Sequence, residues 1–290
     1  MATFKNLIFV AILATLLAIG LVKSGLITSA PAQSTETAYH RILRTNTIRC
    51  GYSVWKPFMW VDPTTGKKMG IFPDLIEEAG KRLGLKVVWQ EEVGWGSLAE
   101  ALRSGRIDMA CAGYWLDSTR IKYLLPTVPQ LYSPTYIYVR AADAHKFATP
   151  EALNSSRYTV ATIDGGGAEK RVIAQHFPRS KQLTLPELSG AADEMEDLAT
   201  GKADFVIQDP PTAELYETHN PGKIVSAFPN TPMDFFPTVM LMPPDDVMLK
   251  SMIDNTLLGI EHDGTLDAIL KKYHATHLVL RNPQPVAPPQ

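Results

Sequence analysis

Short apolar runs alternate with stretches of helical periodicity, and this alternation predicts parallel β-sheets covered by helices. The first group of elements comprises strands at 47–52, 86–90 and 107–111, with helices at 73–83 and 97–105 between them. Gly84 is the exit signal expected at the end of the first helix. Ser97 and Glu100 form a capping-box pattern at the start of the second helix.

The second half of the chain repeats this order. Its predicted strands are 158–163, 182–185 and 205–208, and its predicted helices are 168–176 and 191–200. An extended apolar run at 132–140 precedes the group and is suited to crossing between two lobes. A return strand at 238–242 and closing helices at 246–261 and 265–273 follow it. The chain is therefore expected to fold as two α/β lobes.

One short pattern occurs in both groups. Residues 104–109 read Ser-Gly-Arg-Ile-Asp-Met, and residues 200–205 read Thr-Gly-Lys-Ala-Asp-Phe. Each copy opens a strand, and residues just past the carboxyl end of such a strand line the ligand crevice of an open α/β sheet. The repeat predicts two sheets whose half-sites face one cleft.

Composition narrows the function classes. The 290 residues are 45% hydrophobic and 20% charged, with a formal net charge of −2. The sequence contains no stripe of basic residues, so nucleic acid is not expected as a partner. The seven histidines form no metal-ligand set, so neither a metal nor a cofactor is expected. No Gly-x-Ser-x-Gly elbow supports serine hydrolysis.

The N-terminal segment has the pattern of an export signal. Lys5 precedes the apolar run 7–22, and Ala30-Pro31-Ala32 offers a cleavage site before Gln33, so residues 1–32 are interpreted as a signal peptide. An uncleaved membrane anchor is the alternative. At the other end, the proline-rich residues 281–290 are expected to be disordered.

The two cysteines are compatible with an exported chain, but the sequence does not determine whether they form a disulfide. Cys50 and Cys111 fall in predicted strands that are candidates for neighbours. A disulfide in an oxidising compartment and a pair of buried thiols both remain open.

Two charged residues occupy corresponding places after strands. Arg120 follows the third strand, and its guanidinium suits a ligand carboxylate because it donates two parallel hydrogen bonds. Asp209 follows strand 205–208, where its carboxylate can accept from a ligand ammonium or cap the helix that Pro210 begins. Gly165, Gly166 and Gly167 form either a backbone anion site at a helix start or a plain tight turn.

Five aromatic residues lie at or just after the ends of first-lobe strands. They are Tyr52, Trp55, Trp95, Tyr114 and Trp115. Their common position predicts a pocket that stacks an apolar, aromatic or cationic group. By contrast, Glu194 and Glu196 are expected to be solvated helix residues.

Several short pieces carry a family resemblance. They are Trp55-Lys56-Pro57-Phe58, Gly70-Ile71-Phe72-Pro73-Asp74-Leu75, Ser104-Gly105-Arg106-Ile107-Asp108, Ala112-Gly113 followed by Arg120, Gly201-Lys202-Ala203-Asp204, and Asp263-Gly264-Thr265 before Lys271-Lys272-Tyr273. From about Ile42 to Tyr273 the chain resembles the bacterial extracellular solute-binding proteins of family 3, which serve ABC transporters of polar amino acids.

The resemblance implies a type II periplasmic binding protein-like fold, with a two-strand hinge between the lobes. Residues 42–134 and 238–280 would form the first lobe, and 135–237 the second. It also implies a monomeric, non-enzymatic periplasmic protein that binds a small solute and delivers it to a permease in the inner membrane.

The resemblance assigns roles to several site residues. Arg120 would hold the carboxylate of the solute, Asp209 its ammonium, and Trp55 and Trp95 would sandwich its side chain. Three departures, at Trp115, Gly166 and Gly167, replace hydroxyl residues of the family, and Phe72 stands where an acidic residue is usual. They favour a modified, aromatic or cationic amino acid as the solute.

Two alternatives stay open. Cyclohexadienyl dehydratases resemble these binding proteins, and Glu169 would match their catalytic acid in the turn that begins at Gly165. A ligand-sensing module is the other alternative, if residues 7–22 stay in the membrane.

Overall fold

The computed structural model describes residues 36–276 and residue 279, so the expected signal peptide and proline-rich tail lie outside the described residues. The described residues from Ala38 onward belong to one structural unit. None of the helices described in it has the length and apolar character needed to span a bilayer.

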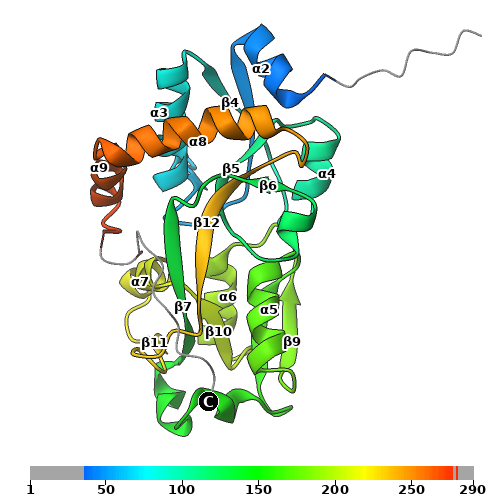
Figure 1. Ribbon diagram of the computed structural model, residues 1–290. Coiled ribbons are helices and arrows are strands. Elements are labelled where there is room, and N and C mark those ends of the chain that lie inside the picture. The colour runs from blue at the N-terminus through cyan, green and yellow to red at the C-terminus, as the bar shows by residue number, and fades with distance from the viewer. Residues whose placement is uncertain (1–35, 277–278, 280–290) are drawn as a thin grey trace, which may run out of the picture. The chain divides into compact units, whose positions relative to one another are not determined.

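A continuous sheet runs through the described chain in the strand order β4-β1-β5-β12-β7-β10-β8-β9 (Figure 1). These strands are β1 (Thr47–Tyr52), β4 (Lys86–Glu92), β5 (Met109–Trp115), β7 (Leu131–Arg140), β8 (Thr159–Ile163), β9 (Lys181–Leu185), β10 (Phe205–Gln208) and β12 (Asp234–Met242). The short strands β6 (Leu125–Pro126) and β11 (Ile224–Ser226) pair with β12 and β7. A separate hairpin, β2 (Trp60–Val61) and β3 (Lys68–Met69), has no counterpart in the sequence prediction.

Two long antiparallel strands join the lobes. They pair from Asp234 with Thr135 to Thr238 with Leu131. Beyond this stretch β12 pairs with β5, whereas β7 pairs with β10. Each strand therefore starts in one lobe and ends in the other, which is the hinge of the expected two-lobed fold. The predicted residue boundaries of the lobes stay predictions.

The helices fall into two groups at the two ends of these strands (Figure 1). Lobe 1, built on β4, β1 and β5, carries α2 (Ala38–Thr45), α3 (Ile71–Leu83), α4 (Leu98–Arg103), α8 (Val247–His262) and α9 (Thr265–Lys272). Lobe 2, built on β10, β8 and β9, carries α5 (Gly167–His176), α6 (Ala191–Ala199) and α7 (Pro210–His219). Single-turn 3₁₀ helices are η1 (Arg120–Lys122), η2 (Ala141–Lys146) and η3 (Pro150–Leu153).

Local sequence explains most helix ends. Gly84 ends α3 in the left-handed conformation, as predicted. Asp209 caps α7 by accepting from the Thr212 N–H. The predicted capping box at Ser97 is wrong, because its hydroxyl donates instead to the Glu187 carboxylate at 3.0 Å. Helix α2 was not predicted.

The aspartate of the repeated pattern makes the same backbone contact in both lobes. Asp108 accepts from the Arg49 N–H of β1 at 2.7 Å, and Asp204 accepts from the Thr159 N–H of β8 at 2.8 Å. Each aspartate thus fixes the strand next to its own. Arginines complete both sites: Arg49 and Arg41 at Asp108, and Arg140 at Asp204.

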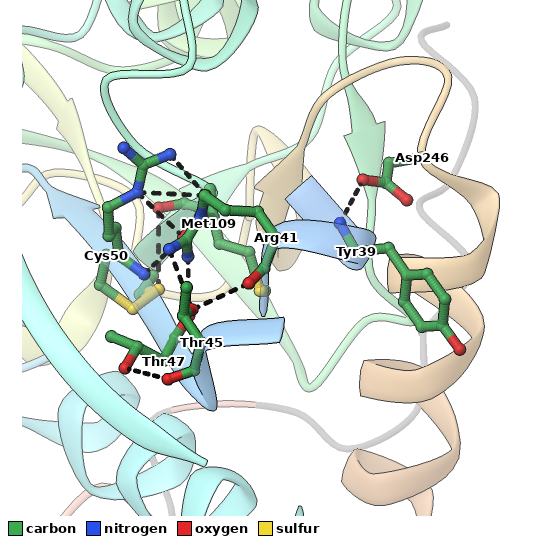
Figure 2. Close-up of polar contacts among 10 residues, drawn as sticks. Tyr39, Arg41, Thr45, Thr47, Cys50, Met109 and Asp246 are labelled. Carbon is green, nitrogen blue, oxygen red and sulfur yellow. Dashed lines mark hydrogen bonds and ion pairs between the residues drawn. A yellow bond between two sulfur atoms is a disulfide. The ribbon is translucent and has the colours of Figure 1, made fainter. Parts of the chain in front are cut away.

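Arg41 gives helix α2 its place in lobe 1 (Figure 2). Its Nε donates to Asp108 at 2.7 Å and its Nη2 donates to the carbonyl of Thr47 at 2.7 Å. In the first turn of the helix, the Tyr39 N–H donates to Asp246 at 2.8 Å. Figure 2 also shows the disulfide between Cys50 and Cys111, whose Cα atoms are 5.4 Å apart on the neighbouring strands β1 and β5.

Candidate functional site

A cavity lies between the carboxyl ends of the strands of the two lobes, and the space between its walls, including solvent at its open mouth, is about 490 Å³. Lobe 1 contributes side chains that follow β1, β4 and β5, and lobe 2 contributes those at the ends of β8 and β10 and on α5 and α6. The lining residues are Trp55, Trp95, Trp115, Arg120, Ile163, Gly166, Gly167, Ala168, Glu169, Ala191, Glu194 and Gln208. This is the position that the α/β topology assigns to a ligand.

Arg120 reaches the cavity from η1. Asp117 organises this turn, since its Oδ1 accepts from the Thr119 and Arg120 N–H groups at 2.6 and 3.2 Å. The guanidinium is nine-tenths buried, and its Nη2 donates to the carbonyl of Gly165 in lobe 2 at 3.2 Å. Its Nη1 has no hydrogen-bond partner. Burial lowers the pKa of Arg120, but a guanidinium stays charged.

Three indole rings form the wall around this guanidinium. Trp115 and Trp95 each meet Trp55 edge-on, with ring centroids 5.2 and 6.4 Å apart. The Arg120 guanidinium lies 6.0 Å from the Trp95 ring centroid. Trp55 Nε1 donates to the Thr212 hydroxyl at 2.9 Å, whereas Trp115 Nε1 is buried without a partner.

Two carboxyl groups form the opposite wall. Glu169 on α5 is 6% exposed and accepts from the Thr162 hydroxyl at 3.0 Å. Glu194 on α6 is 1% exposed and accepts from the Gln208 amide at 2.7 Å. Burial raises the pKa of Glu169, and burial together with the neighbouring Glu169 raises the pKa of Glu194.

The expectation that Glu194 is solvated is therefore wrong. Along α6 the buried residues are Ala191, Glu194, Met195 and Leu198. Glu194 thus occupies a position on the buried face, with the i, i+3, i+4, i+7 spacing of an apolar stripe. That spacing is the sequence signal that could have identified it. Gln208, also missed, is the last residue of β10.

The glycine turn lets the lobes meet. Gly165 has φ +78°, and a Cβ there would lie 2.2 Å from the Gly96 nitrogen of lobe 1. Gly166 and Gly167 line the cavity at the start of α5, as the sequence predicted for this turn. A Cβ on Gly167 would lie 2.7 Å from Asp117 Oδ2. Glycines here therefore permit close approach of the two lobes.

Asp209 lies outside the cavity lining. It is fully buried, and its two oxygens accept from the Thr212 N–H at 3.0 Å and the Thr212 hydroxyl at 3.1 Å. Burial raises the pKa of Asp209 to about 7. The geometry is that of the helix cap that the sequence offered as one of two roles. Its contact with a solute stays a prediction.

The remaining candidates lie behind the cavity. Tyr114 is fully buried beneath Arg120, with its ring centroid 5.7 Å from the guanidinium carbon. Gly113 makes room for Phe72, whose ring a Cβ would meet at 2.4 Å. Tyr52 packs edge-on against Trp89, with centroids 5.9 Å apart. These three residues support the wall without lining it.

The cavity therefore separates two kinds of polar group. Lobe 1 presents the buried donors Arg120 Nη1 and Trp115 Nε1, with Asp117 Oδ2 beside the guanidinium at 3.7 Å from Arg120 Nε. Lobe 2 presents buried acceptor oxygens of Glu169, Glu194 and Gln208. Such a site suits a ligand with an anionic group at one end and a cationic group at the other. Within residues 36–276 and 279, no cluster of histidine, cysteine and acidic side chains is arranged to hold a metal ion.

Relatives among curated proteins match most of this chain but less than half of their own length. Membrane-bound lytic murein transglycosylase F of Salmonella paratyphi B is 26% identical over 217 residues, which cover 72% of this chain and 40% of that protein. This chain thus resembles one part of that larger protein.

Solved structures share the fold over nearly their full length. The ancestral amino acid-binding protein AncCDT-1, a precursor of cyclohexadienyl dehydratase, has a TM-score of 0.70 and 25% identity, covering 80% of this chain and 97% of that one. An ancestral arginine-binding protein bound to arginine has a TM-score of 0.65 and 26% identity, covering 79% and 98%.

The family follows from a match over most of the sequence. The profile of the bacterial extracellular solute-binding proteins, family 3, matches residues 48–276, which include both copies of the repeated pattern and every residue that lines the cavity. The chain belongs to the bacterial extracellular solute-binding proteins, family 3.

Proposed function

We propose that this protein is the periplasmic substrate-binding component of an ABC transporter and binds an amino acid or a similar amino compound in the cavity between its lobes. The observation that carries the proposal is the pair of buried donors, Arg120 Nη1 and Trp115 Nε1, that have no hydrogen-bond partner within the part of the chain that the structure describes. A ligand carboxylate satisfies both of them. Leaving a buried charged donor unsatisfied is costly, so the site favours an anionic group there.

The free energies of the expected contacts are large enough for micromolar affinity for the solute. A hydrogen bond to a charged group contributes about 1.5–3 kcal/mol. Micromolar binding requires about −8 kcal/mol in total. The guanidinium of Arg120 and the three indole rings together can supply a large part of this free energy.

A cationic amino acid is the first solute class to test. The indoles of Trp55, Trp95 and Trp115 form a surface that attracts cations. The ancestral relative bound to arginine supports the same class. We therefore expect L-arginine or L-lysine among the solutes.

Calorimetric titration tests the proposal with matched ligands. L-Arginine and L-lysine are compared with agmatine and cadaverine, which keep the side-chain cation and lack the carboxylate. The amino acids should bind at least about tenfold more tightly, a difference of about 1.4 kcal/mol. Equal affinity for each amino acid and its carboxylate-free analogue would contradict the proposed function. Failure of every carboxylate-bearing amino compound to bind would contradict it as well.

Export and delivery complete the proposal. The protein acts as a monomer outside the inner membrane and passes its solute to a permease there. Sequencing the N-terminus of the mature protein tests the location. A start at Gln33 supports a free periplasmic protein, whereas retention of residues 7–22 supports the membrane-anchored sensing alternative.

A second function rests on Glu169. Its carboxyl group lines the cavity, and burial raises its pKa, so it is suited to donate a proton at neutral pH. A dehydratase acting on prephenate or arogenate needs such an acid. Release of an aromatic product by the purified protein, lost in Glu169→Gln, would establish this activity and replace the transport function.

A further inference from the structure

Three buried oxygens point to a second polar subsite. No donor from the described residues, 36–276 and 279, reaches Glu169 Oε1, Glu194 Oε1 or Gln208 Oε1. Their side chains are 6%, 1% and 5% exposed, and all three line the cavity. The other oxygen of each glutamate is occupied, by the Thr162 hydroxyl and by the Gln208 amide. What the three free oxygens lack is a donor from outside the protein.

Two buried carboxyl groups line the same cavity, and this setting opposes ionisation of both. Burial raises the pKa of each, and the like charge of Glu169 raises the pKa of Glu194 further, so we expect the pair to hold a proton at neutral pH. Among the nearby charges, Lys170 favours ionisation of Glu169, but burial outweighs it. Lys170 lies near Glu169 but pairs at 2.9 Å with Asp164, Asp193 adds a like charge beside Glu194, and the Arg120 guanidinium lines the opposite wall.

We propose that the cationic group of the solute binds between Glu169 and Glu194, accepted also by Gln208 Oε1, and displaces the proton that the pair shares. This inference rests on the proposed function and assigns the cation to the carboxyl pair instead of Asp209. Asp209 is fully buried away from the cavity lining, and Thr212 already donates to both of its oxygens.

A measurable consequence is linkage between solute binding and pH. Each solute bound releases up to one proton, so affinity rises by up to about tenfold per pH unit while the pair remains protonated. The solute is released more readily in mildly acidic surroundings. A site with a permanently ionised carboxylate would bind the same cation without this dependence.

The experiment measures protons released on binding. The proteinogenic L-amino acids are screened by thermal shift at pH 7.5, and the tightest binder is titrated calorimetrically in phosphate and in Tris, whose ionisation enthalpies differ. We expect a binding heat that differs between the buffers in the direction of proton release. We also expect affinity several-fold higher at pH 8.0 than at pH 6.0.

Glu194→Gln and Glu196→Gln provide the matched pair of variants. Both lie on α6, but Glu196 is exposed and its carboxylate accepts from Tyr216. Glu194→Gln should change the proton release and weaken binding at least tenfold, and Glu196→Gln should change neither. Binding with equal heats in both buffers and no pH dependence overturns the inference while the proposed function stands. If no amino acid binds, the proposed function fails and this inference fails with it. The wild-type result decides even if a variant does not fold.

Discussion

The two lobes use the same construction inside their sheets and opposite chemistry at the cavity. Asp108 in lobe 1 and Asp204 in lobe 2 each accept from the backbone N–H of the neighbouring strand and from an arginine. At the cavity, lobe 1 presents the Arg120 guanidinium and indole rings, whereas lobe 2 presents Glu169 and Glu194. The repeated pattern builds the scaffold, and the residues beyond its strands determine what can bind.

The two aspartates of the repeated pattern differ in burial and in their number of arginine partners, so their energetic equivalence can be tested. Asp108 has a side chain 1% exposed and two arginine partners, but the side chain of Asp204 is 26% exposed and has one. Asp108→Asn should lower the free energy of unfolding by about 3–5 kcal/mol, because the buried Asp108 carboxylate is lost and two partly buried guanidinium groups are left without it. Asp204→Asn should cost about 1 kcal/mol. Urea unfolding compares them, and equal losses would show that the two sites are energetically alike.

Arg120→Ala tests the donor side of the cavity. It should weaken binding of the solute by about 2–5 kcal/mol, since a desolvated carboxylate then lacks its partner. Arg106→Ala is the control, because Arg106 is half exposed and pairs only with Glu91. Calorimetric titration measures both, and an unchanged affinity in Arg120→Ala would remove this residue from the site.

Gly165→Ala tests the approach of the lobes. Its Cβ would meet Gly96 of lobe 1, so solute affinity should fall by at least about tenfold, or 1.4 kcal/mol. Gly105→Ala is the matched control because it has φ +69° and open space around it. This control should lose about 1–2 kcal/mol of stability through left-handed strain and keep its affinity. Equal affinities in both variants would show that close contact at Gly165 is not needed.

The raised pKa of buried Asp209 predicts how the free energy of unfolding depends on pH. Burial raises the pKa of Asp209 from 3.8 to about 7, so its contribution is fully present below pH 3.8 and is lost as pH rises through 7. Without solute, the melting temperature should therefore fall between pH 5 and pH 8. Each such group accounts for up to about 1.4 kcal/mol per pH unit. Asp209→Asn should flatten this fall, and exposed Asp245→Asn should leave it unchanged; identical profiles would contradict the assignment.

The smallest expected effect separates the two candidate acceptors. Asp209→Asn keeps an acceptor for the Thr212 N–H, since asparagine caps helices as well as aspartate does. Solute affinity should stay within about twofold of the wild-type value, in contrast to the loss expected for Glu194→Gln. Titration of both variants decides, and a large loss in Asp209→Asn would restore Asp209 as the ammonium site.

The sequence predicts the scaffold well because local signals specify it. Apolar runs located the strands, Gly84 and Pro210 marked helix ends, and the repeated aspartates identified two equivalent lobes. Arg120 and the three tryptophans were candidates because each lies at the end of a strand or a few residues beyond it, and the structure places all four in the cavity lining.

Long-range contacts explain what the sequence did not reveal. The partner of Ser97 is Glu187, which belongs to the other lobe, so no local pattern could show it. Glu194 faces inward because α6 packs against β10, where the Gln208 amide donates to it. A glutamate on a helix is ordinarily solvated, and tertiary packing reversed that preference here.

A structure of the protein with its tightest-binding amino acid, determined at pH 8, tests the central claim most directly. The account predicts a solute carboxylate within hydrogen-bonding distance of Arg120 Nη1 and a cationic group held between Glu169 and Glu194. A solute bound outside this cavity, or one whose cationic group lies on Asp209 with both glutamates uninvolved, would contradict it.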